Sequence, residues 1–194
     1  MINYLSLWRN ARKWPENEQY GEMGILNDLL YRVQAVNDGL QSGTLVRDVV
    51  VKHGDDILEL QKIQLFEGKA ANGEDIRPYY SEDLKPGGWF HSVESAGRYA
   101  AWKKDGINYP YRANRNPDAP NLYVNGKFHD ELGVRFGTDS VAIVGDTPYA
   151  AAIIAKYGLT TFGLTGANWE VLFEERGGYN ELMNEIKSKL YVRS

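Results

Sequence analysis

The chain has no cysteine among its 194 residues, and its three histidines, His53, His91 and His129, are far apart in the sequence. The lack of cysteine excludes disulfides and thiolate metal sites, and the histidines do not have the spacing of a zinc site. No run of about 18 apolar residues is present to span a bilayer, and the N-terminal residues MINYLSLWRNARKW lack the apolar segment of a signal peptide. We therefore expect a protein made in the cytoplasm, with no cofactor and no membrane contact.

The sequence also lacks the short motifs that carry common enzyme chemistry. There is no GxSxG, HExxH, GxxxxGK[ST] or GxGxxG pattern. The nearest acidic cluster is Asp55, Asp56 and Glu59, in which Asp55 and Glu59 would lie one helical turn apart and could share a cation or a proton. This cluster supports a weak hydrolase hypothesis, but a solvated helix face explains it better. We expect that the protein is not an enzyme.

Aromatic residues are abundant, with five Trp and 13 Tyr. Tyr and Trp are enriched at protein interfaces, where the ring is buried and the polar end stays hydrated. The net charge of −4 gives no overall attraction to nucleic acid. At 43% hydrophobic residues, the chain is long enough for one sizeable core, so we expect one domain with elaborations.

Two long helices are predicted in the first third of the chain. The first covers residues 21–39, and the second covers residues 43–66 and ends at Gly68. Their apolar residues recur at helical spacing: Ile25, Leu29, Val33 and Val36 in the first helix, and Val46, Val49, Val50, Ile57, Leu60 and Ile63 in the second. The connecting loop is short, so we expect the two helices to form an antiparallel helical hairpin.

The remaining pattern predicts an α+β fold, with long helices packed across a small antiparallel β-sheet. A first strand is expected at DIRPYY (residues 75–80), and a hairpin at GVRF and VAIVG (residues 133–136 and 141–145), covered by the second long helix. Further helices are expected at residues 95–105, 148–158 and 165–176 and, after the break at Gly177 and Gly178, at residues 179–191.

We divide the chain into an N-terminal arm, residues 1–20, and a single α+β domain, residues 21–194, with an irregular aromatic-rich insertion at about residues 81–121. The arm either folds back on its own chain as a short helix or docks on a neighbouring subunit. Aromatic and basic residues interleave at residues 89–115, which fits a protein interface better than stacking on single-stranded nucleic acid. The interface candidates are Trp8, Trp14, Trp89, Tyr99, Trp102, Tyr109 and Arg112.

Three segments resemble a known family in the same order along the chain. LELQKIQLFEGKAANGEDIRPYYS resembles a helix ending in QLxxG followed by a glycine-containing turn and an IxxYS strand. LYVNGKFHDELGVRFGTDSVAIVGD is similar to an LxxTGxF segment before a hairpin, with Asn125 and Gly126 where Thr-Gly is usual. AKYGLTTFGLTGANWEVL resembles a closing YGxxIFGLTxxN. The family consists of small virion proteins of tailed bacteriophages, especially those infecting Bacteroides, of the head-to-tail connector or tail-completion kind.

The resemblance covers roughly residues 55–175 and implies a structural, non-catalytic subunit of a phage neck or tail, assembled beneath the portal as a ring of twelve or six copies. The implied partners are the portal and other neck or tail proteins, with possible contact to DNA in the lumen, and the implied location is the virion. The insertion and the arm exceed those of the short family members, so the ring neighbours do not carry over. The alternative is a nucleic-acid-binding protein that uses residues 89–115.

Overall fold

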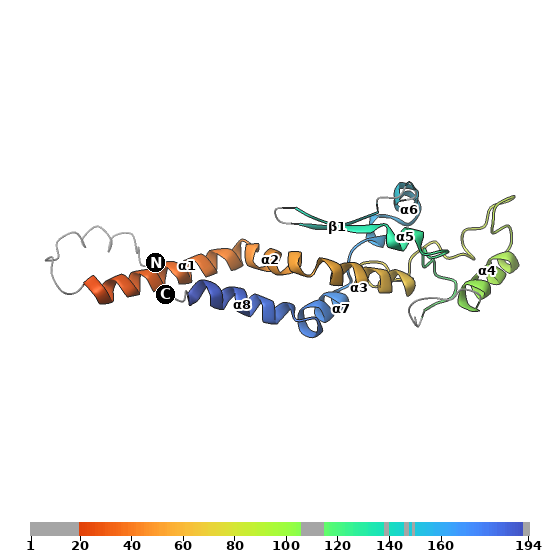
Figure 1. Cartoon of the computed structure of the whole chain (residues 1–194). Coiled ribbons are helices and arrows are strands. Elements are labelled where there is room, and N and C mark those ends of the chain that lie inside the picture. The colour runs from red at the N-terminus through yellow and green to blue at the C-terminus, as the bar shows by residue number, and fades with distance from the viewer. Residues whose placement is uncertain (1–19, 106–114, 138–139, 146–147, 149, 192–194) are drawn as a thin grey trace, which may run out of the picture.

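The computed structural model describes residues 20–105, 115–137, 140–145, 148 and 150–191. The described part is mostly helical with one small antiparallel sheet, which confirms the predicted α+β class, and the molecule is elongated (Figure 1). The helices are α1 (Tyr20–Gln41), α2 (Thr44–Lys52), α3 (Gly54–Phe66), α4 (Val93–Asp105), α5 (Lys127–Asp130), α6 (Ala150–Tyr157), α7 (Gly166–Glu170) and α8 (Gly178–Leu190). Two short helical segments are η1 (Leu159–Thr161) and η2 (Val171–Glu175), and the strands are β1 (Leu132–Phe136) and β2 (Val141–Gly145).

The first three helices follow one another along a single rod, and α8 runs beside α1 and α2 (Figure 1). The C-terminal end of α8 is placed by Arg32, whose Nη1 donates to the Leu190 carbonyl at 3.3 Å. Near its start, Glu181 and Glu185 accept hydrogen bonds from Lys52 Nζ at 3.1 and 2.6 Å. These contacts make α8, the last helix in the sequence, the packing partner of the first two.

The predicted hairpin between the first two helices is wrong. The Ser42 N–H still bonds the Asp38 carbonyl, and Gly43, at φ 74°, begins α2 in nearly the same direction as α1 (Figure 1). The helix predicted over residues 43–66 is also divided in two. At His53 (φ −96°, ψ 23°) the amide is shared between the Val49 and Val50 carbonyls, and Gly54, a poor helix former, follows it.

The predicted hairpin of strands is confirmed. β1 and β2 pair antiparallel, with Val134 opposite Ile143 and Phe136 opposite Val141. These four side chains share one face of the sheet and pack on a core cluster that includes Leu60 of α3. The expectation that the helix ending near residue 66 covers the hairpin is therefore correct.

No strand forms at residues 75–80, so that prediction is wrong. The Ile76 N–H bonds the Gly68 carbonyl, whereas the Tyr80 N–H bonds the Asp118 carbonyl. Only one isolated bridge, between Lys69 and Asp75, occurs beside this segment in the described chain. Because Ile76 and Tyr80 bond to different parts of the chain, no continuous ladder is built, and the segment becomes part of the irregular region before α4.

Two buried glutamines on α3 hold the segment that leads into α7. Gln61 Oε1 accepts from the Gly163 N–H at 2.8 Å, and Gln64 Nε2 donates to the Gly163 carbonyl at 2.8 Å. Gln64 Oε1 also accepts from the Thr165 N–H and from Asn168 Nδ2, both at 2.9 Å. We call this set of bonds the glutamine clamp. It joins residues about one hundred positions apart in the sequence, because the chain returns to α3 only after the hairpin and α6.

The segments that carry the family resemblance meet around this clamp. Gln64 belongs to the first segment, and Gly163, Thr165 and Asn168 belong to the third. The second segment contributes His129, whose ring packs edge-on against Phe66, at 4.8 Å between ring centroids. The three segments therefore contribute to one packed region of the fold.

We predict that Gln64→Ala destabilises the protein by about 3 kcal/mol or more, because several buried groups lose their partner at about 1 to 3 kcal/mol each. Urea unfolding followed by circular dichroism measures this change. The matched control is Gln34→Ala, at an exposed position of α1, which should change the free energy of unfolding by less than about 0.5 kcal/mol. Equal stability of the two variants would show that the clamp does not stabilise the fold.

Leu60→Ala is expected to cost about 2 to 5 kcal/mol, as large-to-small changes in a core do. Leu60 is 5% exposed within the cluster under the hairpin, whereas Leu159, the control, is 74% exposed. The same urea titration should show a much smaller loss for Leu159→Ala. A loss below about 1 kcal/mol at Leu60 would contradict the packing of α3 under the hairpin.

Candidate functional site

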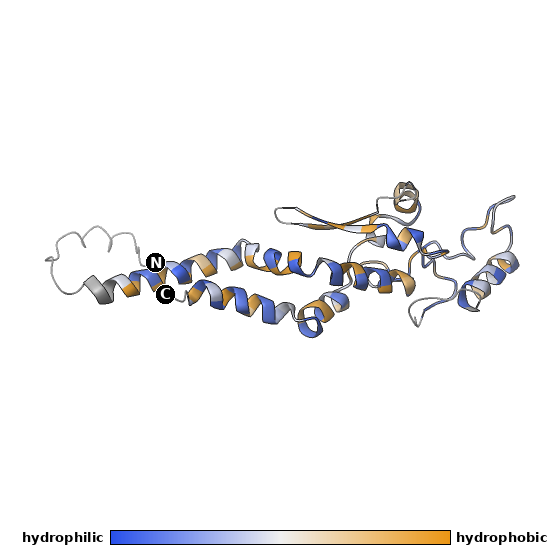
Figure 2. Ribbon diagram, viewed as in Figure 1, coloured by the Kyte–Doolittle hydropathy of each residue, from blue (hydrophilic) through white to orange (hydrophobic). Residues whose placement is uncertain are grey.

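Several exposed apolar side chains lie close together on α1. Ile25, Leu26, Leu29 and Leu30 have between 48% and 70% of their side chains exposed. Figure 2 shows hydrophobic residues along α1, including the part that extends beyond the end of α8. We call the exposed apolar side chains Ile25, Leu26, Leu29, Leu30, Val33 and Leu40 the α1 face.

The part of the α1 face from Ile25 to Leu30 is uncovered because α8 is too short to follow α1 to its start. Leu190, the last residue of α8, lies beside Arg32, so the first turns of α1 project past it. Of the apolar stripe predicted in this helix, only Val36 is buried. Contiguous exposed apolar patches of this kind mark interaction sites in soluble proteins. The sequence pattern located the stripe correctly but assigned it to an internal hairpin, which the structure lacks.

A second surface lies at the opposite end of the molecule, around α4 (Figure 1). Here a cleft of about 590 Å³ has four aromatic side chains among its lining residues. We call it the aromatic cleft; its lining residues are Asp83, Lys85, Gly88, Trp89, Phe90, Tyr99, Trp102, Val124 and Lys156.

Three of the seven interface candidates from the sequence lie together in the aromatic cleft: Trp89, Tyr99 and Trp102. Tyr99 packs against Tyr80 and Phe90, at ring-centroid distances of 5.0 and 5.1 Å, and is partly buried. Trp89 and Trp102, in contrast, are 87% and 46% exposed. The other four candidates, Trp8, Trp14, Tyr109 and Arg112, lie outside the described residues.

The charged groups at the rim of the aromatic cleft are paired. Lys156 of α6 donates to Asp83 Oδ2, and Lys85 lies 3.8 Å from Asp83 Oδ1. Burial raises the pKa of the Tyr80 hydroxyl behind the cleft, so this side chain stays neutral. The cleft therefore presents two exposed indole rings and two lysines. The packed rings of Tyr80, Phe90 and Tyr99 lie beneath them.

The acidic cluster that motivated the hydrolase hypothesis is divided by the fold. Asp56 and Glu59 both bind Nη1 of Arg176, at 3.1 and 3.0 Å, while Asp55 is exposed. Asp56 also bonds His53 Nδ1 at 2.8 Å. In the part of the chain that the structure describes, no group of three or more His, Asp or Glu side chains is arranged to hold a metal ion. The two bound carboxylates join η2 to α3.

Two ionisable side chains are buried between α4 and the segment before the hairpin. Lys103 donates to the Tyr123 carbonyl, and burial, reinforced by the charge of Arg115, lowers its pKa to about 7. His129 Nε2 lies 3.1 Å from the Asn121 carbonyl, and burial lowers the pKa of its imidazole to about 4. Protonation is disfavoured where these groups are buried, so Lys103 lowers the stability as the pH falls from about 10.5 to 7, and His129 lowers it as the pH falls from about 6.5 to 4.

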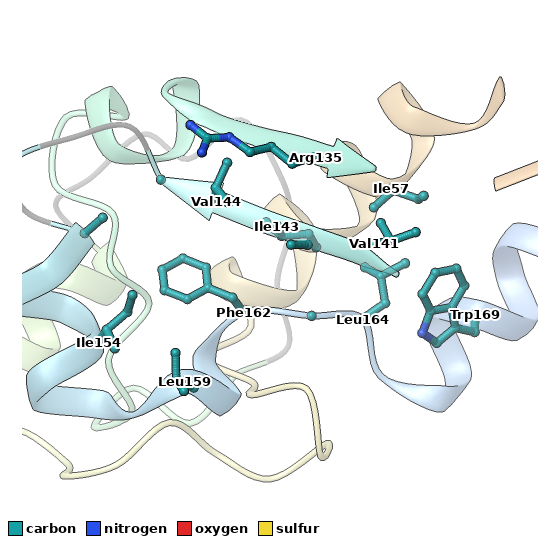
Figure 3. Close-up of a pocket in the computed structure, with 14 residues that line it drawn as sticks. Ile57, Arg135, Val141, Ile143, Val144, Ile154, Leu159, Phe162, Leu164 and Trp169 are labelled. Carbon is teal, nitrogen blue, oxygen red and sulfur yellow. The ribbon is translucent and has the colours of Figure 1, made fainter. Parts of the chain in front are cut away.

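An apolar pocket of about 490 Å³ lies beside β2 (Figure 3). Its walls are the strand itself, α6, the segment from Leu159 to Leu164, and Trp169 of α7. We call it the hairpin pocket. The sequence analysis missed it, because the pattern of the hairpin does not show which segment lies opposite the strand edge.

Comparison with protein-family models, with curated proteins and with solved structures finds no match to this chain. No helix in the described ranges is long and apolar enough to cross a membrane.

We predict that acid destabilises the protein through His129. Its pKa is about 4 in the fold and about 6.5 when unfolded, so only the unfolded chain binds a proton between these values. This group alone should remove about 2 to 3 kcal/mol of stability as the pH falls from 7 to 4. In His129→Gln this part of the pH dependence should disappear, as measured by urea unfolding at several pH values.

His91→Gln is the matched control, because His91 is exposed. It should keep the full loss of stability between pH 7 and pH 4. If His129→Gln loses as much stability over this range as His91→Gln, the buried imidazole is not the source of the acid sensitivity.

Proposed function

We propose that this protein is a non-catalytic structural subunit that works as part of an assembly. The observation that carries this proposal is the α1 face, where four large apolar side chains within two helical turns are about half exposed or more. Burying apolar surface yields about 25 cal/mol per Å², so covering this face with a partner is strongly favourable. A subunit that assembles has a reason to keep such a face uncovered within its own chain.

The arrangement of two different surfaces supports a ring. The α1 face and the aromatic cleft lie at opposite ends of an elongated molecule (Figure 1). Contacts between unlike patches are heterologous, and they generate a closed ring when the rotation between neighbours closes. Exposed Trp89 and Trp102 are suitable anchors for such a contact, because Trp is enriched among the residues that dominate interface energy.

The specific assembly we propose is the head-to-tail connector, neck or tail of a tailed bacteriophage, beneath the portal. The support is the resemblance of three segments to small virion proteins of this kind, together with the position of those segments around one packed region. In this proposal the ring has twelve or six copies, matching a twelve-fold portal, and its partners are the portal and other neck or tail proteins.

One observation favours a second function, the binding of single-stranded nucleic acid. The aromatic cleft combines exposed indole rings with Lys85 and Lys156, and bases stack on such rings at about 1 to 3 kcal/mol each. Phosphate contacts release counterions, so this function predicts binding that weakens steeply with salt. Binding to a single-stranded oligonucleotide that is abolished by Trp89→Ala would favour it over a protein contact at the cleft.

The proposed structural role predicts that Leu30→Glu prevents incorporation into particles. A buried carboxylate in the contact would cost several kcal/mol, while the fold should survive because Leu30 is exposed within the subunit. Mass spectrometry of particles from infected cells measures incorporation, and circular dichroism of the purified chain checks the fold. Gln34→Glu, an exposed polar position on the same helix, is the matched control and should be incorporated normally.

Normal incorporation of Leu30→Glu would show that the α1 face is not a contact. Failure to find the wild-type chain in purified particles would reject the virion location itself, even if the chain associates in solution.

A further inference from the structure

The outer edge of β2 carries backbone groups that the sheet does not use. Among the described residues the sheet has two strands, so each strand has one partner there. At the turn, the Gly137 N–H donates to the Ser140 carbonyl at 2.8 Å, which makes this pair the first hydrogen-bonded pair of the ladder. Bonded and non-bonded pairs alternate in an antiparallel ladder, so Ala142 and Val144 face β1 with their backbone groups. The N–H and C=O groups of Val141, Ile143 and Gly145 therefore point to the open edge.

This open edge faces the hairpin pocket. Figure 3 shows Val141, Ile143 and Val144 above the gap, with Phe162, Leu164 and Trp169 on the other side. The facing segment has little to offer a ligand, because the Gly163 N–H and C=O are both held by the glutamine clamp. One wall of the pocket thus carries the unpaired N–H and C=O groups of β2, and the other described walls carry mostly apolar side chains.

We propose that the hairpin pocket receives an extended apolar segment that pairs with β2 as a third strand, and that this segment is residues 2–8 of a second copy of the chain. The proposal rests on the self-assembly proposed above and names the contact that the N-terminal arm makes. Strand addition of this type takes its affinity from main-chain hydrogen bonds and its specificity from pockets for alternate side chains.

The sequence of residues 2–8, INYLSLW, fits this pocket. It is rich in aromatic and branched residues, and each face of an extended strand would carry apolar side chains: Ile2, Tyr4 and Trp8 on one, and Leu5 and Leu7 on the other. The lining of the pocket is likewise mostly apolar.

Charge complementarity sets the direction of the added strand. Arg9, Arg12 and Lys13 follow the apolar segment. The exposed acids Glu170, Glu174 and Glu175 follow Trp169, which lies at the Val141 end of the pocket (Figure 3). Basic residues meet these acids only if the segment runs antiparallel to β2, with Trp8 near Val141 and Tyr4 near Gly145.

The length of chain before α1 favours a second copy over the same chain. Arg47 Nε donates to the Gly137 carbonyl at 2.8 Å, so the turn of the hairpin lies beside α2. The rod from Tyr20 to Arg47 is about 40 Å long at about 1.5 Å per residue. Residues 9–19, fully stretched, span about 36 to 40 Å at 3.3 to 3.6 Å per residue. The chain's own arm would reach its pocket only with no slack, whereas the arm of a neighbour has no such limit.

Cysteine cross-linking tests the proposal, since the chain has no native cysteine to interfere. One copy, carrying an affinity tag, receives a single cysteine at Leu5, Ser6 or Leu7, each in turn. A second, untagged copy carries Ala142→Cys, at an exposed position of β2. After mixing and mild oxidation, we expect a disulfide-linked dimer whose yield alternates along the arm, with positions 5 and 7 differing at least fivefold from position 6.

The control replaces Ala142→Cys by Ala101→Cys, an exposed alanine of α4, and should give no alternation. A yield that does not alternate at Ala142→Cys, or no cross-link at all, would overturn strand addition. A disulfide that forms only within a double variant such as Leu7→Cys with Ala142→Cys, and never between copies, would overturn the second-copy assignment.

The same cross-link is then sought in purified particles, so that the two proposals fail separately. A chain that is present in particles but never cross-links at Ala142→Cys retains the structural role and rejects this contact. A cross-link in solution from a chain absent from particles supports the contact and rejects the virion location.

Discussion

The fold depends on two glutamine side chains buried in a position where a helix usually presents apolar residues. Gln61 accepts a hydrogen bond from the Gly163 N–H, and Gln64 donates one to the Gly163 carbonyl. Gln64 also accepts a hydrogen bond from the Asn168 side chain. A buried amide is favourable only while its hydrogen bonds are made, so these contacts specify one arrangement of the chain around α3. The hairpin pocket follows from this constraint, because the clamp holds its far wall at a fixed place opposite β2. The Gly163 N–H and C=O, on the segment that faces β2, are bonded to the clamp and not to the strand.

The clamped region accounts for one end of the protein, while the other end has little to bury. Among the described residues, the core clusters lie around α3, the hairpin and α4, and the long α1 contributes only Val36 to the buried side chains. Packing against α8 alone leaves the α1 face exposed. The two helices therefore form an incomplete bundle that a partner can complete. This division between a packed body and an uncovered rod is what we expect of a subunit whose final core includes its neighbours.

Much of this architecture could be predicted from the sequence. Periodicity located α1, α8 and the helix that the structure divides into α2 and α3, and Pro148 and Gly158 marked the ends of α6. Alternation located the hairpin, and Thr165 was identified as the start of α7, where its hydroxyl accepts from the Asn168 N–H. Gln64 was missed, although it lies four residues after Leu60 on the same helical face, because a polar residue is assigned to solvent by default. The hairpin of α1 and α2 was wrong because loop length alone does not decide whether the chain reverses or continues at Gly43. The exposure of the α1 face is a property of packing, so the amphipathic pattern by itself could not reveal it.

Amide hydrogen exchange over α1 tests the central claim, that the α1 face is an assembly surface, most directly. Helices covered by a partner exchange slowly, and helices that open locally exchange fast. We predict that peptides spanning Ile25 to Leu30 are protected in the assembled protein and exchange at least tenfold faster in the dilute chain, while peptides of α3 are protected equally in both. Rapid exchange of the α1 peptides in the assembled protein would contradict the claim, because the face would then remain uncovered where its partner should lie.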